Sequence, residues 1–196
     1  MGVAKGQDSR ASEIFSLDSD QVRLVMPSIC VMEAWSAFEA ERRRRMKFVD
    51  DLRSPINKTS RDLTSDHAKS LNAHLQNASL DSIKLLKDIE IRLRGILRRL
   101  AGEQHYGRVE LIPMSRAILV QSLLHAHMEE PTDNLILATI LHHAKRNRNV
   151  PKILLTSNSN DFDTPEIHEL LDDAGFVKYL PRTEQFLGWF GAQNSL

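Results

Sequence analysis

Four short apolar runs, separated by helical patterns, constrain the fold of this chain more than any other feature of its sequence. The runs cover residues 22–27, 109–113, 152–157 and 177–181. Three of them end in proline, which stops a strand ladder, and runs this short and apolar are typical of parallel strands covered on both faces. Helical patterns cover residues 81–100, 115–128, 132–145, 165–174 and 183–190. This alternation predicts an α/β fold, a three-layer α/β/α sandwich built on a parallel sheet.

The length of 196 residues predicts one domain over residues 1–196. The stretch between the first two apolar runs is too long for a single crossover and contains no strand pattern. We therefore expect a helical insertion at about 36–106, in three segments broken near Ser54, Pro55 and Asn57.

Composition excludes several classes of protein. Cys30 is the only cysteine, so the chain can form neither an internal disulfide nor a cysteine-based zinc site. No apolar run is long enough to span a membrane and no secretory signal opens the sequence, which predicts a cytoplasmic protein with no membrane partner. Because 26 basic residues balance 26 acidic ones, bulk charge does not predict nucleic-acid binding.

The charges are nevertheless unevenly placed along the chain. Arginines occupy positions 42–45, and a second basic run covers residues 142–148. Acidic residues gather at 129–130, 161–163 and 172–173. Such runs are consistent with solvated helix faces, and equally with an enzyme that holds a polyanion near an acidic site. The charge pattern leaves both interpretations open.

Acidic and amide side chains follow three of the predicted elements at one edge of the sheet. Glu33 follows the first apolar run, Asp133 begins an apolar helix, and residues 158–163 follow the third run. Ligands of parallel sheets bind at the carboxyl ends of the strands, and clustered oxygen ligands suit Mg²⁺ or Mn²⁺. Taken singly, Asp133 could be a helix cap, Glu33 a surface residue and residues 158–163 an Asx-turn loop. The three positions together favour a metal site.

Three motifs resemble the PIN-domain family, and within it bacterial members with a long helical insertion. They are Pro-x-x-x-x-Met-Glu at 27–33, Pro-Thr-Asp-x-x-x-x-Ala at 131–138 and Leu-x-Thr-x-Asn-x-x-Asp-Phe at 154–162. The resemblance runs from about residue 7 to residue 190. It implies a metal-dependent endoribonuclease that hydrolyses RNA phosphodiester bonds and leaves a 5′-phosphate and a 3′-hydroxyl.

The resemblance also implies roles for particular residues. Glu33, Asp133 and Asp161 would be ligands of Mg²⁺ or Mn²⁺, with Asp163 as a nearby additional carboxylate. Asn158 stands where family members carry Asp or Asn. We expect Arg42, Arg43, Arg44 and Arg45 to hold the RNA backbone by charge. Many family members are toxins of toxin–antitoxin pairs, so an antitoxin is an expected partner, and the sequence leaves a homodimer open.

The sequence departs from the family pattern at its beginning. The family's sheet starts with a central strand that ends in an acid and lies between the strands matching 22–27 and 152–157. The chain opens with residues typical of the loop and helix that follow that strand. We therefore expect Met1 to be an internal methionine, and the chain as given to be unstable and inactive. An alternative function is a catalytically degenerate PIN-like module that binds RNA or a protein without cleavage.

A few other residues could carry chemistry. Trp35 and Tyr106 could stack on a base, although Trp35 fits core packing better. His125 and His127 lie two apart on a predicted helix, which points them to different faces and disfavours a metal pair. Cys30 lies among apolar neighbours and is expected to be a structural thiol.

Overall fold

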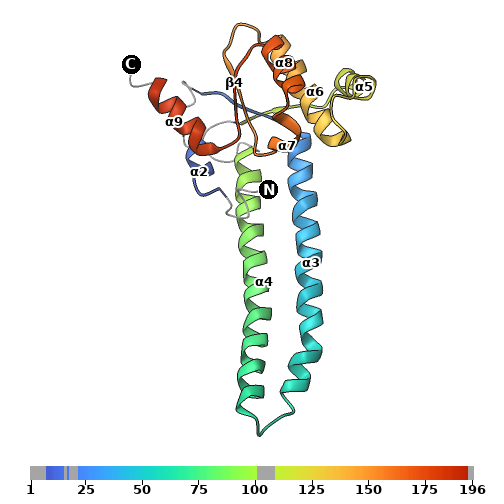
Figure 1. Ribbon diagram of the computed structural model, residues 1–196, viewed down its shortest axis with the longest axis vertical. Coiled ribbons are helices and arrows are strands. Elements are labelled where there is room, and N and C mark those ends of the chain that lie inside the picture. The colour runs from blue at the N-terminus through green and yellow to red at the C-terminus, as the bar shows by residue number, and fades with distance from the viewer. Residues whose placement is uncertain (1–7, 16, 18–21, 101–108, 194–196) are drawn as a thin grey trace. The chain divides into compact units, whose positions relative to one another are not determined.

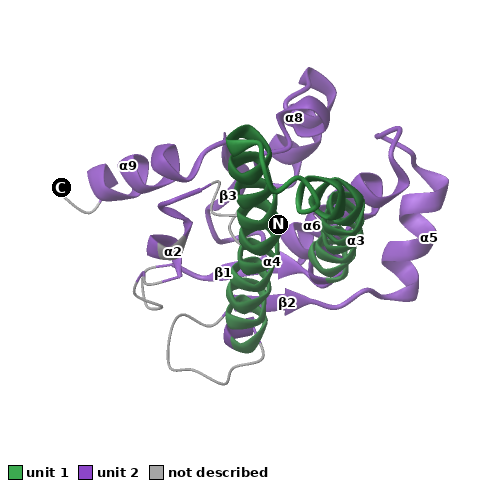
Figure 2. Ribbon diagram, turned by 90° about the horizontal axis from the view of Figure 1, so that it is seen from below, with its two compact units in different colours: residues 1–7, 32–98 green, residues 8–31, 99–196 purple. Residues whose placement is uncertain are grey.

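The chain is described by a computed structural model covering residues 8–15, 17, 22–100 and 109–193, and it divides into two compact units. Unit 1 contains Met32–Arg98, and unit 2 contains Asp8–Val31 and Arg99–Leu196 (Figure 2). In sequence, residues 32–98 of unit 1 overlap most of the stretch expected as an insertion at about 36–106. Tyr106 and the end of that stretch lie outside the described residues. No helix in the described part of the chain is long and apolar enough to cross a membrane.

All four apolar runs form strands in unit 2, as the sequence predicts. They are β1 (Leu24–Pro27), β2 (Val109–Ile112), β3 (Lys152–Leu155) and β4 (Phe176–Leu180) (Figure 1). Strand β1 pairs with β2 and β3 pairs with β4, and both pairs are parallel. The expected α/β class with parallel pairing is confirmed.

The strands form two separate two-stranded sheets in the described part of the chain, where the sequence predicts one sheet. Each pair extends by one bond past its end, from Ser28 N to Ile112 O and from Thr156 N to Leu180 O. Leu24 of β1 and Ile153 and Leu155 of β3 pack against one apolar cluster around Ile14, Leu180 and Phe186. The two sheets therefore share a core although no described strand joins them.

Helices account for the rest of unit 2. They are α2 (Ala11–Ile14), α5 (Arg116–Leu124), α6 (Pro131–Arg146), α7 (Ser159–Phe162), α8 (Pro165–Asp173) and α9 (Thr183–Gln193). The main core is formed by α6, β3, α7 and α8, with Leu137, Phe162 and Ile167 at most 3% exposed. Gly175, with φ of 84°, ends α8 in the left-handed conformation that glycine adopts without a steric penalty. The chain can then turn directly into β4.

Unit 1 is an antiparallel helical hairpin of α3 (Ile29–Thr59, whose first three residues belong to unit 2) and α4 (Asp66–Leu100). We expected three segments with a break at Ser54 and Pro55, and this expectation is wrong. Pro55 lies in the last turns of α3, where the remaining helical bonds hold the helix together. The less exposed positions of α4 include a series at alternating spacings of four and three: 68, 72, 75, 79, 82, 86, 89, 93, 96 and 100. This is a coiled-coil seam, and Phe38 packs on Leu86, Ile89 and Leu93 at one end of it.

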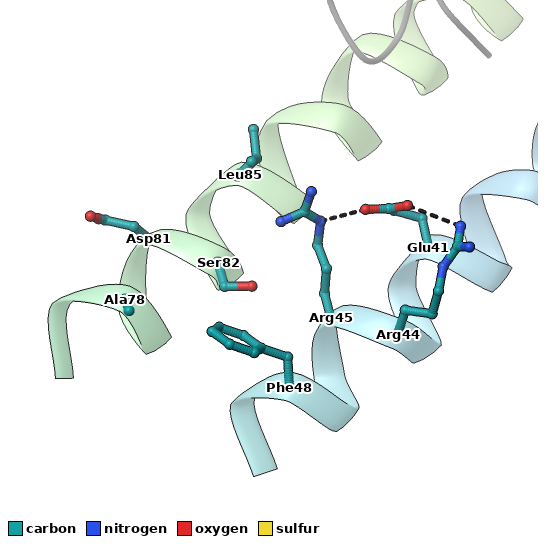
Figure 3. A pocket seen from close by; sticks show the side chains of 8 residues that line it. All are labelled: Glu41, Arg44, Arg45, Phe48, Ala78, Asp81, Ser82 and Leu85. Carbon is teal, nitrogen blue, oxygen red and sulfur yellow. Dashed lines mark hydrogen bonds and ion pairs between the residues drawn. The ribbon is translucent and has the colours of Figure 1, made fainter. Parts of the chain in front are cut away.

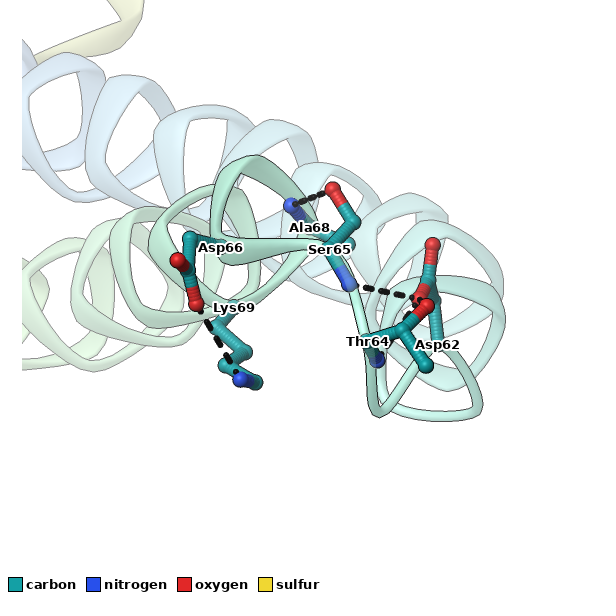
Figure 4. Close-up of polar contacts among 6 residues, drawn as sticks. All are labelled: Asp62, Thr64, Ser65, Asp66, Ala68 and Lys69. Carbon is teal, nitrogen blue, oxygen red and sulfur yellow. Dashed lines mark hydrogen bonds and ion pairs between the residues drawn. The ribbon is translucent and has the colours of Figure 1, made fainter.

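The turn between α3 and α4 is fixed by side-chain hydrogen bonds (Figure 4). One carboxylate oxygen of Asp62 accepts bonds from the backbone N–H of Thr64 and of Ser65, and from the Thr64 hydroxyl. These donors lower the pKa of Asp62, since they stabilise its charged form. The Ser65 hydroxyl oxygen in turn accepts from Ala68 N and caps the start of α4.

Candidate functional site

Asp133 lies in the first turn of α6, as the sequence predicts. Pro131 opens the helix at a position where the missing N–H is not needed, and Asp133 follows two residues later. The N-terminal end of a helix favours a negative charge because its N–H groups point outward. The side chain of Asp133 is half-buried.

Asn134, the next residue, holds this end of α6 in place. It is 4% exposed, and its amide nitrogen donates to Ser122 O at 2.5 Å and to His125 O at 3.2 Å. Its amide oxygen accepts from His127 N at 3.0 Å. Three bonds thus tie the end of α5 and the segment after it to the first turn of α6. Asn134 was not among the predicted site residues. Its position beside the apolar run 135–138 is the one sequence signal of a buried polar side chain with hydrogen-bond partners.

Asn158 and Asp161 follow β3 and come to the same place as Asp133. Asn158 stands at the start of the four-residue helix α7 and makes no capping bond to it. Its side-chain amide instead lies close enough to the Asp133 carboxylate to lower the pKa of Asp133. Phe162, which is 3% exposed, anchors α7 in the main core and so holds Asp161 beside Asp133.

The environment of Asp133 raises its pKa. Burial is the largest cause, and the negative charge of Asp161 adds to it. The hydrogen bond from Asn158 acts in the opposite direction, and Glu130 contributes a smaller repulsion. Two carboxylates are therefore held together in a half-buried position where their mutual repulsion costs free energy. The structure brings together three of the predicted site residues, Asp133, Asn158 and Asp161.

Asp163, the fourth acidic or amide residue of this segment, has a different partner. Its carboxylate lies 2.7 Å from Nε2 of His168 on α8, and the His168 ring packs edge-on against Tyr179 of β4 at 5.3 Å. Burial, followed by the charge of Asp163, raises the pKa of Tyr179. No sequence pattern predicts the pairing with His168, because this contact joins α8 to the loop after β3.

The remaining predicted site residues belong to unit 1. Glu33 is the fifth residue of α3 and is half-buried. In the arginine run, Arg42 pairs with Glu39 at 3.4 Å. Arg44 and Arg45 both pair with Glu41, at 3.1 and 2.8 Å. Much of the positive charge of this run is therefore balanced within α3.

The structure also places the minor candidates. Helix α5 ends at Leu124, so the expected helix through Met128 is too long. His125 and His127 lie beyond it with their rings stacked at 6.5 Å, rather than on opposite helix faces. Cys30 packs against the main core as a half-buried thiol. Trp35 packs against Phe38, as expected. The Arg94 guanidinium lies over the Trp35 ring, 5.6 Å from its centroid.

The donor set of the cluster fits a hard divalent cation. Mg²⁺ is commonly held by one or two carboxylates with water completing its shell, and Asp133, Asp161 and the Asn158 amide oxygen are ligands of this kind. Their mutual repulsion is the observation that supports the fit, because a cation would relieve it. Within the described residues, no three His, Cys, Asp or Glu side chains form a metal-binding group. The fit is therefore to a site with two carboxylates.

These features define the chain as a parallel α/β protein with an acid–amide–acid cluster at the carboxyl end of a strand. A sequence profile described as "PIN domain" matches residues 2–162. The chain belongs to the PIN-domain family, whose members are generally nucleases. No curated protein and no solved structure matches the chain.

Proposed function

We propose that this chain is a divalent-metal-dependent endoribonuclease of the PIN type. The observation that carries the proposal is the convergence of Asp133 in the first turn of α6 with Asn158 and Asp161 after β3, where burial and the charge of Asp161 raise the pKa of Asp133. A fold does not keep two carboxylates in such a place for stability, since each lowers the stability of the other. Residues with pKa values perturbed in this way concentrate at functional sites.

The proposed roles follow from the arrangement. Asp133 and Asp161 would hold Mg²⁺ or Mn²⁺, and the Asn158 amide lies beside the Asp133 carboxylate. The bound cation supplies a more acidic water and neutralises charge on the scissile phosphate. Asn134 is a positioning residue that fixes the first turn of α6. We assign Asp163 as an outer carboxylate oriented by His168.

The nuclease proposal is tested on a labelled single-stranded RNA with the full chain. We expect cleavage with Mg²⁺ or Mn²⁺, none with EDTA, and none by Asp133→Asn. Asp172→Asn is the matched control, because Asp172 is an exposed acid on α8. Cleavage that persists in Asp133→Asn would contradict the proposal.

A degenerate PIN-like module that binds RNA or a protein without cleavage is the second candidate. Asn158 favours it, because an amide in place of a third carboxylate weakens the attraction for a cation. For this candidate we expect no cleavage under any metal condition, and equal RNA affinity for the wild type and Asp133→Asn. Co-expression with the product of a small adjacent gene tests whether an antitoxin is the partner. The two candidates thus differ in what Asp133→Asn changes.

A further inference from the structure

A groove of about 510 Å³ runs along one face of the α3–α4 hairpin (Figure 3). It exists because α4 places the small residues Ala78 and Ser82 opposite Phe48 and Arg45 of α3. Ser82 is 8% exposed, and its hydroxyl oxygen has no hydrogen-bond partner within the described residues. The seam of the hairpin is therefore incompletely packed at this point.

Large apolar side chains flank the groove and remain open to solvent. Phe48 is 46% exposed and Leu85 is 41% exposed. Leu71 lies two heptads before Leu85, with Ala78 between them, so the three form a stripe beside the seam. Helical hairpins bury such stripes against further helices, and contiguous exposed apolar surface marks an interaction site.

Charges of both signs stand at the rim of this groove. Arg44 and Arg45 of α3 are paired with Glu41 (Figure 3). Across the groove, Asp81 of α4 is paired with Lys84. Because each helix balances its own charges, a polyanion such as RNA gains no net attraction at this rim. A second copy presents the same ion pairs with the two helices exchanged, so that the arginine side of one copy can face the acidic side of the other.

We propose that a second copy of this chain covers the groove and that the two hairpins form a four-helix bundle. A two-fold axis parallel to the helices lays α3 of one copy over α4 of its partner. Arg44 of each copy then faces the partner's Asp81 across the apolar stripe. A hairpin face about 45 Å long and about 20 Å wide offers roughly 900 Å² per copy, which is enough for a stable dimer. The proposal is independent of the nuclease function.

The first experiment measures the mass of the full chain by light scattering and sedimentation from about 1 to about 100 μM, a range that detects a dimer of micromolar affinity. We expect a dimer for the wild type, and for Phe48→Glu and Leu85→Glu a dissociation constant at least about 30-fold higher. The matched controls are Met46→Glu and Ile83→Glu. These residues are 41% and 45% exposed and lie two positions away on the same helices, so they point away from the groove. We expect both controls to dimerise like the wild type, with the same helical circular dichroism in all five proteins.

The second experiment does not depend on burying a charge. Arg44→Glu and Asp81→Arg are each expected to weaken the dimer, and the double variant to restore it, because the pair across the axis is then only reversed. A wild type that is monomeric at every concentration overturns the proposal. The proposal is also overturned if groove and control variants raise the dissociation constant of the dimer equally. A third contrary outcome is a monomeric chain whose RNA affinity changes in a groove variant.

Discussion

The two units of this chain hold their charged side chains in opposite ways. In unit 1, ion pairs join residues three or four apart on one helix, as in Arg45–Glu41, Lys84–Asp81 and Arg94–Glu90. In unit 2, Asp133 and Asp161 come from different helices and have the same charge. Local pairs add a few tenths of a kcal/mol to a helix, whereas an acidic pair lowers stability. The ion pairs of unit 1 therefore stabilise the fold, whereas the acidic pair of unit 2 is held together by the fold at a cost in stability.

Removing one member of the acidic pair tests that difference most strongly. For Asp161→Asn we expect RNA cleavage to fall by more than about 100-fold, because loss of a direct ligand should exceed the 10–100-fold cost of losing a supporting one. Without metal, the variant should melt about 2–4 °C higher for each kcal/mol of repulsion removed. Mg²⁺ should raise the melting temperature of the wild type only. Differential scanning fluorimetry checks both, and a variant that is less stable without metal contradicts the comparison.

Asn134→Ala tests how unit 2 holds the site. We expect the free energy of unfolding to fall by about 2–3 kcal/mol, since the substitution leaves two carbonyls and one N–H without their partner. Asn147→Ala is the control, because its amide bonds the carbonyl of His143 in the same helix. Its loss should cost about 1 kcal/mol or less. If urea unfolding shows the same loss of free energy for both variants, the hydrogen bonds of Asn134 stabilise the chain no more than a bond within one helix.

Two buried serines make the next comparison, one in each unit. Ser82 in unit 1 and Ser122 in unit 2 are 8% and 7% exposed. The Ser122 hydroxyl donates to Leu119 O at 2.9 Å, while that of Ser82 has no partner in the described residues. We expect Ser82→Ala to stabilise the chain and Ser122→Ala to destabilise it, each by about 1 kcal/mol. Urea unfolding of both variants measures the two signs.

The pH dependence of stability gives a smaller effect of known sign. Because the pKa of Asp133 is raised above 3.8, the folded state holds this proton more tightly than the unfolded state. Stability from this group is therefore present below the unfolded pKa and is lost as the pH rises through the folded pKa. In metal-free buffer, the wild type should lose stability relative to Asp133→Asn over that window. A constant difference between the two proteins from pH 3 to 8 would contradict the assignment.

The smallest effect is expected in unit 1. Arg53 pairs with Asp50 on the exposed side of α3, and Arg53→Ala should change the free energy of unfolding by less than about 0.5 kcal/mol. The change should vanish at high salt, since exposed pairs are screened. A loss above 1 kcal/mol in urea unfolding would mean that local pairs contribute more than the comparison allows.

The sequence was informative wherever structure is local. Strand positions followed from short apolar runs ended by proline, and the start of α6 followed from Pro131 and Asp133. The break predicted at Pro55 is wrong. A proline near the end of a long helix disturbs hydrogen bonds in one turn only, and the remaining turns stay intact. The length of α5 was also misjudged, since the segment after Leu124 is held by Asn134 rather than by helical bonds.

By itself, the sequence determined the α/β class, the parallel strands and the two segments that carry Asp133 and residues 158–161. Each depends on periodicity or on residues close together in the chain. Only the tertiary structure decided that Asn158 lies beside Asp133, that Asp163 pairs with His168, and that Asn134 fixes the first turn of α6. These contacts join different elements, and their energies depend on burial and on neighbouring charge. A pattern along the chain contains neither quantity.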